Sequence, residues 1–211
     1  MPRRPRAPRV RRDPETARAL LLDAAERVFA RRHPDDAGLK QVADEAGVSH
    51  ALITHYFGTY RGLVEATLER RMRALRARVL ARMTDASVIA RPGELLALLF
   101  ESLEDPVHLR LMRWFMGSER ASSAESLGLR DHGIQLIAAQ LASVLAPEPP
   151  RELVDKLEVA IAVAVAASYG YATGKHALAN ALGRKPSPAL DTAVRETLAG
   201  MLQSYLRDFR K

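Results

Sequence analysis

Six histidines and a group of carboxylates are the side chains best suited to metal binding or acid–base chemistry. His50 and His55 are five positions apart, whereas two imidazoles share one helical face at a spacing of four, and the other histidines are isolated. The chain has no cysteine, no glycine-rich phosphate loop and no G-x-S-x-G motif, and Glu101, Glu104 and Asp105 resemble the exposed end of a helix. We therefore expect no catalytic site, no metal and no cofactor.

A second kind of chemistry, hydrogen bonding to nucleic-acid bases, is suggested by one short run of side chains. His50 and His55 can donate to or accept from bases, Thr54 can hydrogen-bond, and Ala51 can contact a thymine methyl. Tyr56 is better placed for a phosphate. These side chains can read a base sequence only if a helix presents them to the major groove.

The surrounding residues supply the helices for that presentation. The pattern predicts a short helix at 39–45, a turn, and a second helix that begins after Ser49 and ends near residue 57. Gly47 can adopt the left-handed conformation that the turn needs, Ala43 allows close helix approach, and the Ser49 hydroxyl can cap the second helix. An ordinary corner between two helices is the alternative interpretation. The apolar seal between the two helices is predicted to be Val42, Ala46, Val48 and Ile53.

The flanks favour the DNA-binding interpretation. Asp13-Pro14-Glu15 is typical of a helix start, and His33-Pro34 should end that helix. Residues 1–12 hold six arginines and three prolines, so we expect an arm that is disordered in isolation. The arm is either a solvated tail or a DNA contact.

Residues 39–64, which include the run ADEAGVSHALITHYFGTYRGLV, resemble the DNA-binding head of the TetR-type (tetracycline repressor-like) transcriptional regulators. The resemblance covers residues 13–65. It implies a three-helix helix-turn-helix head, a helical C-terminal ligand-binding and dimerisation domain, and repression relieved by a small molecule. The domains expected on this basis are the arginine-rich arm (1–12), the head (13–62) and the C-terminal domain (63–211).

Three positions depart from the family pattern. Tyr60, followed by Arg61, stands where the family has a lysine, and Thr54 replaces the usual aromatic residue. The threonine that commonly opens the first motif helix is replaced near Gly38. The first two exchanges would alter phosphate contacts. The candidate DNA-contacting residues are Lys40, Gln41, Ser49, His50, Ala51, Leu52, Thr54, His55, Tyr56, Tyr60 and Arg61.

Composition agrees with an all-α fold. Hydrophobic residues make up 47% of the chain but aromatic residues only 5%, so Leu, Ala and Val must fill the core, and no alternating strand pattern is present. The net charge of +7 fits a polyanionic partner. The start of the chain lacks a secretory signal pattern, and the longest apolar run is far shorter than the roughly 20 residues of a membrane-spanning helix. We therefore expect a cytoplasmic protein that does not contact a membrane.

The C-terminal part should consist of further helices. Apolar and aromatic residues there could line a ligand cavity, with ordinary core packing as the alternative. The arginines of the helix predicted near 61–82 are expected mostly on a solvated face. The candidate ligand-binding residues are Phe100, Leu103, His108, Met112, Trp114, Phe115, Met116 and Tyr169.

Two C-terminal helices, near 151–182 and 188–209, are predicted to form a dimer interface. The first carries small residues such as Ala160 and Ala164, and the second carries an apolar stripe that includes Leu198. We therefore expect a homodimer that binds a pseudo-palindromic operator in double-stranded DNA and responds to a small-molecule effector. The alternative is a ligand-independent architectural or housekeeping DNA-binding protein; an enzyme is a more distant one.

Overall fold

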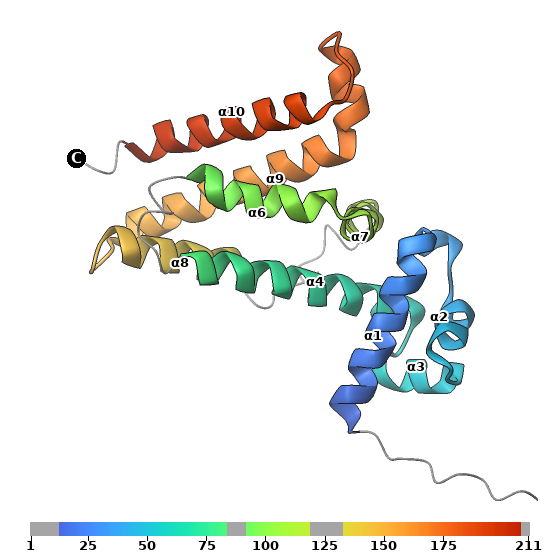
Figure 1. Ribbon diagram of the computed structural model, residues 1–211. Coiled ribbons are helices and arrows are strands. Elements are labelled where there is room, and N and C mark those ends of the chain that lie inside the picture. Colours follow the sequence, from blue (N-terminus) through green and yellow to red (C-terminus); the bar gives the residue numbers. More distant parts are fainter. Residues whose placement is uncertain (1–12, 84–91, 119–132, 208–211) are drawn as a thin grey trace, which may run out of the picture. The chain divides into compact units, whose positions relative to one another are not determined.

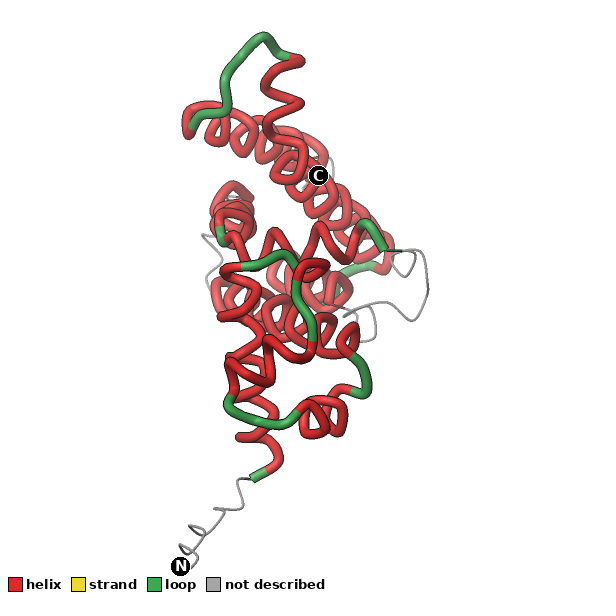
Figure 2. The backbone as a smooth tube through the Cα atoms, turned by 90° about the vertical axis from the view of Figure 1, so that its right-hand side faces the viewer, coloured by secondary structure: helices red, strands yellow, loops and turns green. Residues whose placement is uncertain are grey.

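The computed structural model describes residues 13–83, 92–118 and 133–207. Every regular element within these ranges is a helix, and Figure 2 shows helices joined by loops without a strand among them. The predicted all-α class is therefore confirmed. The chain divides into two compact units, with the boundary between Thr67 and Leu68. None of the helices so described is both long and apolar enough to cross a membrane.

Within residues 13–67, the described part of the first unit, the chain forms three α-helices and the first turns of a fourth (Figure 1). They are α1 (Pro14–Arg31), α2 (Leu39–Ala46), α3 (His50–Phe57) and α4 (Tyr60–Arg82), with a 3-10 turn at Pro34–Asp36 between α1 and α2.

Local signals set the ends of α1 as the sequence predicts. The Asp13 carboxylate accepts a hydrogen bond from the Thr16 amide at 3.2 Å, which satisfies one of the free amides at the helix start. After Arg31 the backbone becomes extended, and Pro34 opens the 3-10 turn because it cannot continue an α-helix.

The helices of the first unit enclose one apolar core. Phe29 of α1, Val42 of α2 and Ile53 of α3 are each fully buried. Tyr60 completes this packing, with its ring edge against Phe29 at 6.5 Å between centroids. The same core contains Leu21, Leu22, Ala24, Ala25, Val28, Ala43, Leu63 and Val64.

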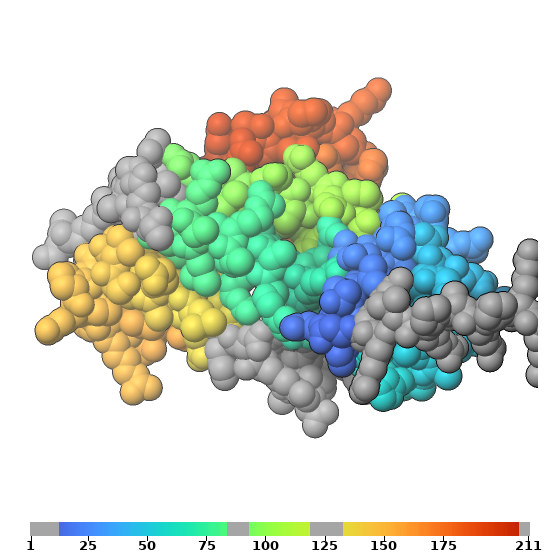
Figure 3. Space-filling model, turned by 60° about the horizontal axis from the view of Figure 1, so that its bottom comes forward, coloured from blue at the N-terminus to red at the C-terminus, as the bar shows by residue number. Residues whose placement is uncertain are grey.

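Over the part of the chain that the structure describes, the second unit is a bundle built from the rest of α4 and five further helices. These are α6 (Pro92–Glu104), α7 (Pro106–Met116), α8 (Gly133–Leu145), α9 (Arg151–Ala181) and α10 (Pro188–Arg207). Helix α8 packs along α9, and α6 packs against α10. Figure 3 shows α4 (teal) adjoining α8 (yellow) within this unit.

Among the described residues, two apolar clusters hold the second unit together. One joins Met83 with residues of α8 and α9, including Leu141 and Leu157. The other joins α6, α9 and α10 through the aromatic residues Phe100 and Tyr171 together with several aliphatic residues. Because the two clusters share α9, this helix is the central support of the unit.

The apolar stripe of α10 is divided between the core and the surface. Leu198 is only 9% exposed and packs against α6 and α9 of its own chain, whereas Met201 is 64% exposed. Ala160 and Ala164 of α9 are likewise buried within the unit. Among the described residues of these two helices, the exposed large apolar side chains are Val159, Val163 and Leu178 of α9 and Leu182 at its C-cap, with Met201 and Tyr205 of α10. The dimer interface on α9 and α10 stays a prediction.

The arginines of α4 also differ from the predicted solvated face. Arg71 forms an ion pair with Asp105, the residue that caps α7, and its side chain is mostly buried. Arg76 lines a cavity. Arg61, Arg73, Arg78 and Arg82 are exposed, as the sequence predicts.

Candidate DNA interface and ligand cavity

The turn between α2 and α3 has the conformation that the sequence predicts. Gly47 has φ 66° and ψ 36°, in the left-handed region where a residue with a Cβ is strained. The Val48 amide donates to the Ala43 carbonyl at 3.0 Å, and the Gly47 amide donates to the Asp44 carbonyl at 3.2 Å. These bonds close the end of α2 and fix the direction in which the chain enters α3.

Helix α3 is fixed from one side and open on the other. Ile53 is 0% exposed and seals the helix against the core, whereas His50, Ala51, Thr54 and His55 are all exposed. In Figure 3 the α2–α3 segment (blue to cyan) forms part of the visible surface of the first unit. The four predicted base-reading side chains thus lie together on one accessible helix.

Local hydrogen bonds on α3 differ in one respect from the prediction. Ser49 occupies the N-cap position, but its side chain makes no capping hydrogen bond. The Thr54 hydroxyl donates to the His50 carbonyl one turn back, at 3.2 Å. The His55 and Tyr56 rings meet edge to face at 5.2 Å between centroids.

The other candidate DNA-contacting residues fall into two groups. Lys40, Gln41 and Arg61 are exposed, whereas Leu52 and Tyr56 are half-buried.

Tyr60 is held inside the first unit. Its hydroxyl donates to the Pro34 carbonyl at 2.7 Å, and burial raises the pKa of this phenol. The sequence makes Tyr60 a candidate DNA contact at a position where the family has a lysine; in the structure its hydroxyl joins the start of α4 to the 3-10 turn. The arginine arm at 1–12, which the sequence also associates with DNA, lies outside the described residues.

Ion pairs at the surface of the first unit join α1 to α2. The Arg27 Nε donates to Glu45 at 2.7 Å, and Arg31 pairs with the same carboxylate, so α1 and α2 are joined at their surface. Hydrogen bonds from these two arginines lower the pKa of Glu45. The Arg18 guanidinium lies 5.3 Å from the centre of the Phe57 ring, which connects α1 with the end of α3.

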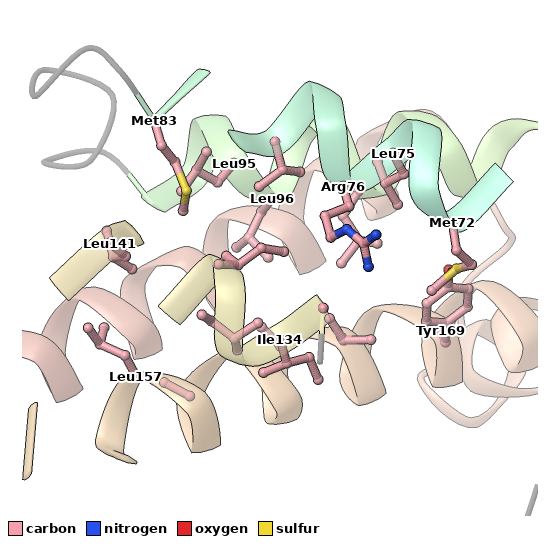
Figure 4. Close-up of a pocket in the computed structure, with 18 of the residues that line it drawn as sticks. Met72, Leu75, Arg76, Met83, Leu95, Leu96, Ile134, Leu141, Leu157 and Tyr169 are labelled. Carbon is pink, nitrogen blue, oxygen red and sulfur yellow. The ribbon is translucent and has the colours of Figure 1, made fainter. Parts of the chain in front are cut away.

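The second unit contains a cavity of about 290 Å³ (Figure 4). This volume is near the lower end of the range typical of small-molecule sites. Helices α4, α6, α7, α8, α9 and α10 all contribute to the wall. Among the labelled side chains in Figure 4 are Met72, Leu75, Arg76, Met83, Ile134, Leu141, Leu157 and Tyr169.

A buried polar pair supports one end of this cavity. The His108 Nε2 and the Tyr169 hydroxyl are 2.6 Å apart, and the hydroxyl lies 3.5 Å from the Met72 sulfur. His108 is 2% exposed; burial, together with the nearby charge of Arg71, lowers its pKa to about 4. The imidazole is therefore neutral near pH 7, and the pair links α7 to α9.

The structure brings together only some of the predicted ligand-binding residues. Met112, Phe115 and Tyr169 line the cavity. Phe100 and Leu103 are buried away from the cavity, His108 lies behind Tyr169, Trp114 is half-buried and Met116 is exposed. Helices α4 and α8 also line the cavity, through residues such as Arg76 and Ile134 that are not among the predicted ligand-binding residues. Apolar residues of α8 such as Ile134 and Ile137 gave a signal, but their periodicity alone does not distinguish a cavity wall from a core.

Sequence comparison connects the first unit with a known family. The family described as "Bacterial regulatory proteins, tetR family" matches residues 21–67. An HTH-type transcriptional regulator BetI from Cronobacter sakazakii is 33% identical over 138 residues, which cover 64% of this chain and 67% of the relative. An uncharacterized HTH-type transcriptional regulator from Mycobacterium tuberculosis is 30% identical over 143 residues. That match spans 64% of this chain and 66% of the relative, just under two thirds of its length.

Solved structures resemble the chain over most of its length. A tetR-family transcriptional regulator from Streptomyces coelicolor gives a TM-score of 0.58 at 25% identity, covering 93% of this chain and 84% of that protein. A TetR transcriptional regulator from Rhodococcus sp. RHA1 gives a TM-score of 0.59 at 16% identity, covering 90% of this chain and 97% of that protein. The second likeness concerns the fold alone.

Proposed function

The chain belongs to the tetR family of bacterial regulatory proteins, and on this premise we propose that it is a DNA-binding transcriptional regulator that a small-molecule effector releases from its operator. The observation that carries the proposal is the contrast on α3. Ile53 fixes the helix against the core, while His50, Thr54 and His55 project from its accessible face. A helix held in this way can enter the major groove without losing its own packing.

The DNA-reading roles follow from side-chain chemistry. The imidazoles of His50 and His55 can donate to or accept from base edges, and the Ala51 methyl suits contact with thymine. Lys40 and Arg61 carry positive charge on the surface of the same unit and suit phosphate contacts, which position the protein more than they specify sequence.

A homodimer is part of the proposal. Val159 and Val163 are four positions apart on α9 and more than half exposed, and Met201 and Tyr205 repeat this spacing on α10. Burying such residues against a second copy removes apolar surface from water. A two-fold dimer carries two heads and therefore calls for an operator with two related half-sites.

The cavity favours control by an effector rather than the ligand-independent alternative. A ligand that binds one conformation of the second unit more tightly shifts the population toward that conformation. The coupling is the factor by which the effector changes operator affinity, and this factor cannot exceed the ratio of the operator affinities of the two conformations. Because α4 contributes residues to both units, it is the covalent route for this coupling.

Selection from a pool of random double-stranded DNA tests the proposal. We expect the full-length protein to enrich an inverted repeat whose half-sites are one helical turn, about 10 base pairs, or a multiple of it apart. A variant with alanine at His50, Thr54 and His55 should retain its helical circular-dichroism spectrum and enrich no related sequence. Failure of the wild-type protein to enrich any sequence would contradict the proposal.

A further inference from the structure

Arg76 gives an otherwise apolar cavity its positive charge. Among the described residues that line the cavity, Glu69 and Arg76 are the charged ones. The Glu69 carboxylate is engaged by the Arg73 guanidinium at 2.6 Å, outside the cavity wall. The remaining wall consists almost entirely of Leu, Ile, Val, Met, Ala and Phe side chains. An electrostatic preference for anions therefore depends on Arg76.

Gly133, at the start of α8, leaves room for the Arg76 side chain. A Cβ on Gly133 would lie 3.1 Å from the Arg76 Nη1 and 3.5 Å from its Cδ. The absence of a side chain at Gly133 thus leaves space for the arginine to lie along α8. In Figure 4 the Arg76 guanidinium projects from α4 into the space between α4 and α8, above Ile134.

The cavity is elongated. Its wall extends from Leu68 in α4 to Met83, the residue that follows this helix. At 1.5 Å per residue this span is about 22 Å, whereas a sphere of 290 Å³ would be only about 8 Å across. In Figure 4 Met83, Leu141 and Leu157 lie toward one end and Met72 and Tyr169 toward the other, with Arg76 between them. Among the residues that the structure describes, those lining the end at Met83 are all apolar. The volume corresponds to roughly ten water molecules at about 30 Å³ each, so it suits a ligand of about a dozen heavy atoms.

We propose that the effector is a medium-chain aliphatic carboxylate, whose acid group binds Arg76 and whose chain extends between α4, α8 and α9 toward Met83. The inference rests on the proposed function, because it names the effector class for the same cavity. A carboxylate enters an apolar site only with a charged or hydrogen-bonding partner, and a guanidinium provides two parallel N–H donors for it. The apolar end of the cavity removes the alkyl chain from water.

The same observations disfavour a ligand with a cationic or a neutral polar head group. A cationic head group would face the positive charge of Arg76, while the Glu69 carboxylate is already engaged by Arg73. A neutral polar head would compete for the Tyr169 hydroxyl, which is held by the His108 imidazole at 2.6 Å.

Isothermal titration calorimetry with decanoate, below its micelle-forming concentration and at pH 8, tests the inference on the full-length protein. Decanol and decyltrimethylammonium share the ten-carbon chain and carry neutral and cationic heads. We expect decanoate to bind at least 10-fold more tightly than either. Arg76→Met should weaken decanoate binding by roughly 10- to 100-fold, because a charged hydrogen-bond partner is lost.

Two variants control for folding and for general charge. Arg76→Lys keeps the positive charge and should retain binding better than Arg76→Met, although it loses the bidentate geometry. Arg78→Met removes an exposed arginine that pairs with Glu101 outside the cavity, and it should change decanoate affinity less than 2-fold. Thermal unfolding identifies any variant that fails to fold. If Arg76→Met does not fold, the decanoate affinity of Arg76→Lys relative to wild type tests the inference instead. Equal affinity for the three ligands, or equal weakening by Arg76→Met and Arg78→Met, would overturn the inference.

The same samples separate this inference from the proposed function. Decanoate binding is measured without DNA, and release is then measured by fluorescence anisotropy on the selected operator. Decanoate binding that depends on Arg76 and lowers operator affinity supports the inference. A protein that binds its operator but not decanoate refutes the ligand class alone. Arg76-dependent decanoate binding by a protein that selects no DNA supports the ligand class and refutes the proposed function.

Discussion

Replacing Gly47 with alanine tests whether the turn between α2 and α3 positions the proposed recognition helix. Gly47 has a φ of 66°, and a Cβ added there would meet no heavy atom within 4 Å. The substitution therefore adds backbone strain without a steric clash. The strain acts on the turn that directs the chain into α3, so its effect should be local to the head.

The expected magnitude follows from the backbone conformation. A left-handed residue with a Cβ costs roughly 1–2 kcal/mol, which corresponds to about a 5- to 30-fold larger population of the opened turn. Gly200 in α10 provides a matched control, because a Cβ there also meets no heavy atom within 4 Å and its φ is not positive. Alanine at that helical position should stabilise by roughly 0.5–1 kcal/mol.

Hydrogen exchange followed by mass spectrometry measures both effects on the full-length protein. In Gly47→Ala, peptides covering residues 39–57 should exchange roughly 5 to 30 times faster, with little change in α9. In Gly200→Ala, exchange in α10 should slow. Unchanged exchange at 39–57 in Gly47→Ala, or faster exchange in both variants, would refute the claim that the positive φ of Gly47 makes alanine destabilising there and not at Gly200.

Three further predictions concern the second unit and the arm. Since burial lowers the pKa of His108 to about 4 from an ordinary 6.5, the unfolded state binds the additional proton, and stability should fall by up to about 3 kcal/mol as the pH drops from 6.5 to 4. Denaturant titrations across this range should show this loss of unfolding free energy in the wild-type protein and not in His108→Phe. Identical pH profiles of stability for the two proteins would contradict the assignment to His108. Val163→Glu should convert the dimer to folded monomers in sedimentation experiments, because a charge then replaces an exposed valine of the proposed interface, and an unchanged dimer would place the interface elsewhere. Removing residues 1–12 should reduce the slope of log affinity against log salt concentration by roughly five, if half of the arm's arginines in a dimer neutralise phosphates at about 0.9 each. Parallel salt dependences would identify the arm as a solvated tail.

The head could be predicted closely from the sequence because its signals are local. Asp13 and Pro14 mark the start of α1, and Gly47 marks the turn, since each has a conformational preference independent of distant residues. Ser49 shows the limit of such reasoning. Its type and position predict a capping hydrogen bond, yet it takes the N-cap position without forming one.

The cavity was harder to predict because its wall is assembled from helices far apart in the sequence. Arg76 belongs to an arginine-rich helix, and a charge pattern of this kind usually indicates a solvated face. Only the packing of α4 beside α8 places that guanidinium next to apolar side chains. Similarly, the spacing of Leu198 and Met201 on α10 does not tell which residue packs inside the chain and which stays exposed.

The most direct test of the central claim is the affinity of single α3 variants for a selected operator and for operators with one base pair changed at a time. We predict that His50→Ala, Thr54→Ala and His55→Ala each lose roughly 1–3 kcal/mol of binding free energy on the selected operator. Each variant should also stop discriminating at a particular base pair, while discrimination at the other positions is retained. Uniform weakening on every operator would contradict the claim, because it would make these side chains phosphate contacts instead of base readers.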